Sequence, residues 1–316
     1  MPNSAVLRGR DVVSSKDFTR TEIEQLFALA TEMEKHGENY RESLRKRKVA
    51  LVFVEPSTRT FQSFLAAVRA LGGEVMPMSD PSMSAMAKGE SLHDTIKMLE
   101  GYGADCIILR HPSRGAARFA AEVAEVPIIN AGSGSQEHPT QSMLDLYTIL
   151  RRRGSIDGVS IGMIGDLRFS RTIPSLSYLA SLFNDVKLYF MAPTVLQVRP
   201  EVELYLKEKN VKYMKVEDTY EIRKHLREVD VLYVTRLQKE RFPDPSEYEK
   251  LRGSYVVNRE LLSYAKIDVG VMHPLPRVDE LSPEIDSLPN AWYFEQAKYG
   301  LPLRMALLYM ILGGEE

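Results

Sequence analysis

Val49-Ala50-Leu51-Val52-Phe53-Val54 is a continuous apolar run, and Glu55-Pro56-Ser57-Thr58-Arg59-Thr60 follows it directly. An apolar run of this length is typical of a strand buried on both faces of a parallel sheet. A helix is expected next, with Phe61, Phe64, Leu65 and Val68 on its apolar face. Gly72-Gly73 is expected to end this helix. The stretch therefore predicts a strand, a polar turn and a helix, the unit from which α/β sheets are built.

The turn between this strand and helix offers several donors to an anion. Its side chains are those of Ser57, Thr58, Arg59 and Thr60. The first helical turn also leaves backbone N–H groups without partners inside the helix. Together these groups suit a small, doubly charged anion such as a phosphate. Ser and Thr also cap helices for structural reasons, so the turn alone leaves a plain helix cap as an alternative.

The same alternation of apolar strands and amphipathic helices continues in both directions along the chain. Thr19 and Glu22 form a capping box at the start of the first helix, and a long helix is expected from Pro139 through Leu150. Further strands are predicted at 74–78, 105–109, 127–130, 159–166, 186–191, 211–216, 230–235 and 269–272. The pattern predicts an α/β fold with two domains, each a mainly parallel sheet flanked by helices.

Length and composition agree with this class and exclude others. A chain of 316 residues is too long for one ordinary core, which favours two domains. A net charge of −2 gives no electrostatic reason to expect binding to nucleic acid. Cys106 is the only cysteine, which rules out a disulfide framework and a thiolate metal site. With no apolar segment of membrane-spanning length, a cytoplasmic enzyme is expected.

Gly162 and Gly165 follow an apolar strand and raise the possibility of a dinucleotide site. The full G-x-G-x-x-G spacing is absent, and Phe190-Met191-Ala192-Pro193 stands where an acidic residue would end the next strand. We therefore interpret these glycines as residues that permit a tight turn and close packing.

Further motifs lie along the chain, separated by long spacers. They are Ala87-Lys88-Gly89-Glu90, Leu109-Arg110-His111-Pro112, His138-Pro139-Thr140-Gln141, Thr235-Arg236-Leu237-Gln238 and His273-Pro274-Leu275-Pro276-Arg277. Together with the Ser57–Thr60 turn, they resemble the catalytic chains of the aspartate carbamoyltransferase family, from about Phe18 to Leu312. The resemblance implies transfer of the carbamoyl group of carbamoyl phosphate to L-aspartate, giving N-carbamoyl-L-aspartate and phosphate in pyrimidine biosynthesis.

The resemblance also implies an organisation for the chain. It assigns residues 1–143 to a carbamoyl-phosphate-binding domain, 144–290 to an aspartate-binding domain, and 291–316 to a C-terminal helix that packs back on the first domain. It implies a homotrimer with active sites shared between neighbouring chains, and it allows a larger assembly with regulatory chains. No metal or cofactor is expected, because phosphate is already a good leaving group.

Residue roles are carried over from the family position by position. Carbamoyl phosphate is expected to bind to Ser57, Thr58, Arg59, Thr60, Ser84, Lys88, Arg110, His138 and Gln141. Within this set, the catalytic residues are Arg59, Thr60, Lys88, Arg110 and His138, with His138 on the carbamoyl oxygen and Gln141 on the carbamoyl amide. Aspartate is expected to bind to Lys88, Arg171, Arg236, Gln238 and the backbone of Leu275 and Pro276. Glu55 is expected to pair with Arg171 and Arg241 when the domains close.

Structural alternatives remain for single residues. Arginines such as Arg110 most often make surface ion pairs, a histidine beside a proline such as His138 is often structural, and the loop 79–88 resembles a solvated connection. Arg110 lies at the end of a strand, however, and open α/β sheets bind ligands at that edge.

The chain departs from its family in three ways: at the pair Phe61 and Leu65, at Ser133, and in the Met-rich loop before Lys88. Phe61 and Leu65 replace an arginine and a glutamate that would pair on the helix after the turn, and Ser133 replaces an acidic residue before His138. Because both members of an ion pair are replaced by apolar residues, we interpret Phe61 as a packing residue.

Two other functions compete with carbamoylation of aspartate. Ornithine carbamoyltransferases share the Ser-Thr-Arg-Thr turn, but they typically carry a cysteine in place of Pro274 and need an acidic partner for a cationic substrate. A non-catalytic relative that binds anions would not need His138 in addition to both substrate pockets. The complete set of motifs therefore favours an active enzyme that carbamoylates a dicarboxylic amine.

Overall fold

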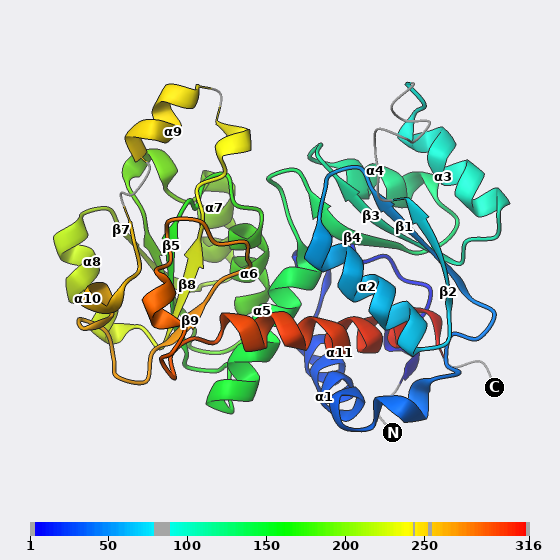
Figure 1. Ribbon diagram of the computed structural model, residues 1–316, viewed down its shortest axis with the longest axis horizontal. Coiled ribbons are helices and arrows are strands. Elements are labelled where there is room, and N and C mark those ends of the chain that lie inside the picture. Colours follow the sequence, from blue (N-terminus) through cyan, green and yellow to red (C-terminus); the bar gives the residue numbers. More distant parts are fainter. Residues whose placement is uncertain (1–3, 79–88, 243, 252–254, 314–316) are drawn as a thin grey trace. The chain divides into compact units, whose positions relative to one another are not determined.

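Parallel strands flanked by helices form two separate sheets, so the predicted α/β fold with two domains is confirmed (Figure 1). The computed structural model describes residues 4–78, 89–242, 244–251 and 255–313. One unit comprises Met1–Leu144 and Tyr299–Glu316, and the other comprises Asp145–Lys298. In the described residues, no helix combines the length and the apolar character that crossing a membrane requires.

The first unit is built on a four-stranded sheet in the order β2-β1-β3-β4, with every pair parallel. Its strands are β1 (Lys48–Phe53), β2 (Glu74–Met78), β3 (Cys106–His111) and β4 (Ile128–Ser133). Its helices are α1 (Arg20–His36), α2 (Thr58–Ala70), α3 (Leu92–Gly101), α4 (Ala116–Val123) and the beginning of α5 (Pro139–Arg153). Because the strands are parallel, the segments that follow β1, β3 and β4 all leave the sheet at one edge.

The second unit is built on a five-stranded sheet in the order β7-β6-β5-β8-β9, again with every pair parallel. Its strands are β5 (Ser160–Gly165), β6 (Lys187–Met191), β7 (Lys212–Val216), β8 (Val231–Thr235) and β9 (Gly270–Met272). Its helices are α6 (Thr172–Ala180), α7 (Pro200–Glu208), α8 (Thr219–His225), α9 (Pro245–Leu251) and α10 (Arg259–Leu262). The strand order reverses direction at β5, so the loops after β5 and β8 leave neighbouring strands at the same edge.

Local sequence explains the boundaries of these elements. The side chain of Thr19 accepts from the backbone of Glu22, and Glu22 reaches back to Thr19, which confirms the predicted capping box of α1. Strand β1 is buried along almost its whole length, as its unbroken apolar run predicts. In the first unit, Ile96 of α3 and Ala120 of α4 share a buried cluster with strand residues of β1, β3 and β4.

The C-terminal helix α11 (Tyr293–Leu312) begins in the second unit and continues in the first from Tyr299 onward. There the backbone N–H of Gly9 donates to the carbonyl of Ile311 at 3.1 Å. The ring of Tyr309 lies 5.2 Å from the ring of Tyr40, edge to face. The predicted return of the last helix to the first domain is confirmed.

Candidate active site

The Ser57–Thr60 turn joins β1 to α2, as the sequence predicts. Ser57 is the N-cap residue of α2 with extended backbone (φ −160°), yet its side chain makes no capping hydrogen bond among the described residues. The simple capping alternative is therefore wrong for Ser57 in this structure. The N-terminal end of a helix, with its outward-pointing N–H groups, generally favours an anion.

His138 and Thr60 meet where β1 and β4 end. The Nε2 atom of His138 lies 3.5 Å from Oγ1 of Thr60, and its Nδ1 atom lies 3.5 Å from Oγ1 of Thr140. His138 and Thr60 are both buried, with 4% and 6% of their surface exposed. Gln141 is also buried and lies one turn along α5 from His138. The structure thus brings together three predicted residues of the carbamoyl phosphate site that come from two distant parts of the sequence.

Arg110 lies in β3 opposite Phe53 of β1, one strand away from the turn. Its guanidinium donates to the carbonyl of Ala131 and to the carboxylate of Glu55, each at 3.1 Å. The Glu55 partner was not expected from the sequence. Glu55 therefore has a cation to pair with inside its own unit, while its pairing with Arg171 and Arg241 on closure stays a prediction.

Two buried polar residues, which the sequence did not identify as functional, shape the turn that presents His138. The side chain of Asn130 donates to Val13 O at 2.8 Å and accepts from Gly132 N and Ser133 Oγ. Glu137 accepts from the hydroxyl of Ser14 at 2.7 Å and from the backbone of Ser15 at 2.8 Å. Burial raises the pKa of the Glu137 carboxyl above its ordinary value, although these donors oppose the shift. Asn130 and Glu137 contact residues 13–15, which lie more than 100 positions earlier in the sequence. Such distant contacts produce no local sequence pattern, so the sequence could not reveal the role of these two residues.

The remaining residues named from the sequence in this unit fall into three groups: packed, exposed, or outside the described residues. The ring of Phe61 packs edge to face on Phe53 at 5.2 Å, which confirms its interpretation as a packing residue. Thr58 and Arg59 are exposed in the first turn of α2. Ser84 and Lys88 lie outside the described residues.

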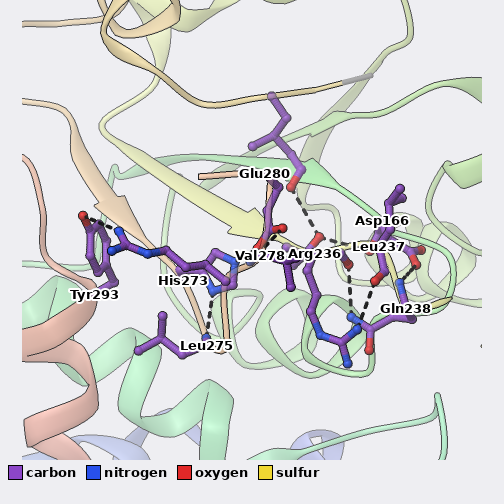
Figure 2. A network of polar contacts seen from close by, with 12 residues as sticks. Asp166, Arg236, Leu237, Gln238, His273, Leu275, Val278, Glu280 and Tyr293 are labelled. Atoms are coloured by element: carbon purple, nitrogen blue, oxygen red, sulfur yellow. Dashed lines mark hydrogen bonds and ion pairs between the residues drawn. The ribbon is translucent and has the colours of Figure 1, made fainter. Parts of the chain in front are cut away.

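In the second unit, Asp166 joins the two loops that carry the predicted aspartate-binding residues (Figure 2). Its carboxylate accepts from the backbone of Phe169 at 2.8 Å and from that of Gln238 at 3.0 Å. Asp166 is fully buried, and this burial raises its pKa to about 6 even though the N–H donors and nearby Arg241 lower it. The sequence placed Asp166 at the end of the predicted strand 159–166 but gave no sign of this role.

The predicted aspartate-binding side chains are distributed over these loops. Arg171 is buried at the N-terminal end of α6, and Arg236 follows β8. Arg236 donates to the carbonyl of Leu237 at 3.0 Å, and the side-chain amide of Gln238 donates to the carbonyl of Arg236 at 3.1 Å. Arg241 donates to the carbonyl of Phe169 at 2.6 Å and so also ties the two loops together.

A cavity of about 300 Å³ opens beside this region of the second unit. Arg236, Leu237 and Glu280 lie on its wall, together with Gly165. Gly165 has φ +113°, and a Cβ atom there would stand 2.1 Å from the carbonyl oxygen of Thr235. The interpretation of Gly165 as a residue of close packing is confirmed. Among the residues that the structure describes, no group of three or more His, Cys, Asp or Glu side chains could hold a metal ion.

The raised pKa of Asp166 predicts a specific dependence of stability on pH. Because the folded carboxyl binds its proton more tightly than an unfolded one, the free energy of unfolding should rise as pH falls from about 6 to about 4. Each unit of pKa difference is worth about 1.4 kcal/mol. Asp166→Asn removes this titrating group. The free energy of unfolding of the wild type, measured in urea, should therefore increase relative to that of the variant as pH falls from about 6 to about 4. Asp185→Asn, at an exposed position of the same unit, is the control, and a constant difference for Asp166→Asn would contradict the assignment.

Comparison with known proteins agrees with this arrangement. Residues 10–151 match the family model "Aspartate/ornithine carbamoyltransferase, carbamoyl-P binding domain", and residues 157–311 match its "Asp/Orn binding domain". The chain is 50% identical to the aspartate carbamoyltransferase catalytic subunit of Thermofilum pendens, over 97% of this chain and 96% of that protein. It is 49% identical to the catalytic subunit of Methanocaldococcus jannaschii, over 97% and 99%.

Solved structures show the same likeness. Aspartate transcarbamoylase from Trypanosoma cruzi in complex with carbamoyl phosphate and aspartate matches with a TM-score of 0.91 and 37% identity, covering 99% of each chain. The catalytic subunit of M. jannaschii aspartate transcarbamoylase matches with a TM-score of 0.83 and 50% identity, covering 94% of this chain and 96% of that one. With both family domains matched and half of its residues shared with these subunits, the chain belongs to the aspartate carbamoyltransferase family as a catalytic chain.

Proposed function

We propose that this chain transfers the carbamoyl group of carbamoyl phosphate to the amine of L-aspartate, giving N-carbamoyl-L-aspartate and phosphate. The observation that carries this proposal is the convergence of His138 on Thr60, both buried, at the edge where β1 and β4 end. A site that only held phosphate would not need a second donor placed beside the phosphate turn to polarise a carbonyl group.

In the first unit, which we propose as the carbamoyl-phosphate-binding domain (1–143), the turn after β1 would hold the phosphate. Ser57, Thr58, Arg59 and Thr60 supply hydroxyl, guanidinium and backbone donors, and Arg110 supplies a second guanidinium. His138 would donate to the carbamoyl oxygen, and Gln141 would accept from the carbamoyl NH₂ group. As charge develops on that oxygen, the fixed donor of His138 stabilises the transition state more than the ground state.

In the second unit, which we propose as the aspartate-binding domain (144–290), planar guanidinium groups suit the two carboxylates of the substrate. Arg171 and Arg236 would bind these carboxylates, with Gln238 beside them. The carbonyls of Leu275 and Pro276 would accept from the substrate amine and orient it. The amine nitrogen would then attack the carbamoyl carbon, the bond from that carbon to the phosphate oxygen would break, and the proton lost by the amine would pass to the leaving phosphate. Positioning and electrostatics account for the catalysis in this scheme.

A colorimetric carbamoylation assay with aspartate and ornithine side by side tests the proposal. We expect product with aspartate and none with ornithine, because the second unit offers arginines rather than an acidic partner for a cationic side chain. Product with ornithine alone would reassign the acceptor. Absence of product with both would support a non-catalytic relative.

We further propose that the chain acts in pyrimidine biosynthesis in the cytoplasm, as a homotrimer in which Ser84 and Lys88 enter the neighbouring chain's site. Regulatory chains are compatible with this assembly. Mixing inactive Ser57→Ala and Lys88→Ala chains should restore activity to about a third or less of wild type, because only sites that receive two unmodified contributions work. Each variant alone, taken through the same exchange procedure, is the control. Mixtures that stay inactive after verified subunit exchange would refute the sharing of active sites between chains.

A further inference from the structure

A chain of buried and partly buried hydrogen bonds in the second unit holds the loop that follows β9 (Figure 2). We infer that His273 and Glu280 are positioning residues that fix the backbone of Leu275 and Pro276 for the amine of the carbamoyl acceptor. The inference rests on the proposed function, because it explains what holds the loop that we propose to bind the amine of the acceptor. Neither residue was singled out by the sequence for this role.

The imidazole of His273 is held in one tautomer. The backbone N–H of Leu275 donates to its Nδ1 atom at 2.8 Å, so Nδ1 carries no proton. Its Nε2 atom therefore carries the proton and donates to Oε1 of Glu280 at 2.7 Å. His273 is 1% exposed, so its ring is enclosed by the protein, while its two partners are partly buried.

Glu280 fastens the far end of the same loop. Its carboxylate also accepts from the backbone N–H of Val278 at 3.2 Å, and its carbonyl accepts from the backbone N–H of Val257 at 2.8 Å. Burial by itself raises the pKa of Glu280, but the hydrogen bond from His273 and the nearby backbone donors outweigh it and lower the pKa. The carboxylate thus stays charged and continues to accept, and one imidazole ring joins the beginning of the loop to its end.

The backbone of His273 is anchored as well. The backbone N–H of His273 donates to Oε1 of Gln296 at 2.9 Å, and the amide of Gln296 donates to Asp145 at 2.6 Å. The hydroxyl of Tyr233 donates to the other oxygen of Asp145 at 2.8 Å. These residues are at most 1% exposed, so none of them can exchange its partner for water.

This anchoring determines where the loop carbonyls point. Leu275 has φ +55°, a left-handed conformation that a leucine adopts only when its surroundings impose it. Its N–H bond to His273 is one such constraint. Glu280 lines the same cavity as Arg236, so the clamp formed by His273 and Glu280 borders the region where the acceptor would bind. Loosening it should displace the amine without changing the carbamoyl phosphate site in the other unit.

Variants can separate the two arms of the clamp. His273→Gln keeps a donor in the place of Nε2 but loses the acceptor for Leu275, whereas Glu280→Gln keeps Oε1 as an acceptor for His273. Glu280→Ala removes that acceptor. We expect His273→Gln and Glu280→Ala to raise the KM for aspartate by about tenfold or more, the scale of a small misplacement of reacting groups, with carbamoyl phosphate binding unchanged. Glu280→Gln should lie within about threefold of wild type on the same scale.

Controls and a second measurement keep the outcomes distinct. Glu208→Ala removes an exposed carboxylate from α7 and should behave as wild type. Hydrogen exchange of the Leu275 amide should be slow in wild type and accelerate at least about tenfold in His273→Gln, independently of any activity. A wild type that makes no product would overturn the proposed function, whereas an active wild type with unchanged aspartate KM in Glu280→Ala would overturn the positioning role. Fast exchange of Leu275 in wild type would overturn the clamp itself.

Discussion

Replacing His138 by alanine should lower kcat by about 10²–10³-fold, the loss measured for removal of a single oxyanion-type donor. The structure supports an effect of this size because the imidazole is buried and its Nε2 atom lies beside Thr60 of the turn that we propose to bind the phosphate. A donor fixed in a dry site stabilises developing charge without reorganisation during the reaction. The loss should appear in kcat and in kcat/KM for aspartate alike, measured under steady-state conditions.

Two companion variants make the result interpretable. His138→Gln can place an amide nitrogen near the former Nε2 position and should recover part of the lost rate. His93→Ala removes an exposed histidine from α3 of the same unit and should leave kcat unchanged. Unchanged turnover in His138→Ala, with the fold retained by circular dichroism, would remove His138 from the mechanism.

Gly165→Ala should destabilise the protein by about 3–5 kcal/mol, the range of the largest single-site effects. The new Cβ would stand 2.1 Å from the carbonyl oxygen of Thr235, and the backbone at Gly165 has φ +113°. Neither problem is relieved by a side-chain movement, because Thr235 is paired with Gly165 in the register of β5 and β8. Urea unfolding at constant pH measures the change.

Gly158→Ala is the matched control for this prediction. Gly158 has φ +77°, also in the left-handed region, but outside its neighbours in the chain no atom lies within 4 Å of the position that a methyl group would take. The substitution should therefore cost only the conformational strain, about 1–3 kcal/mol. Equal losses in both variants would show that the close approach to Thr235 contributes nothing.

Local patterns predicted the elements of this protein well. The apolar run before Ser57, the capping box at Thr19 and the turn before α2 depend on residues close in sequence, and the structure places each of them as expected. The resemblance to the family placed His138 and Thr60 in one site, and their contact agrees with the parallel sheet, since the ends of parallel strands share one edge.

The contacts that hold the site in shape could not be predicted in this way. Gln296 and Asp145 are 151 residues apart, and Arg110 and Glu55 are 55 apart, yet each pair is joined by a hydrogen bond. A buried carboxylate such as that of Asp166 leaves no periodic signal, because its partners are backbone N–H groups that nearly every residue type carries. Motifs therefore indicated the side chains that we propose to contact the substrates, while the groups behind them could be identified only from the structure.

The return of α11 to the first unit has a consequence for biosynthesis. That unit combines residues up to Leu144 with residues from Tyr299 onward, so the ribosome must translate the whole intervening unit before its last helix exists. At ordinary elongation rates this delay is roughly ten to thirty seconds. During that interval the surface destined for Met305, Leu308 and Ile311 stays uncovered on the nascent chain, and chaperones that recognise exposed apolar surface would have their longest opportunity to bind there.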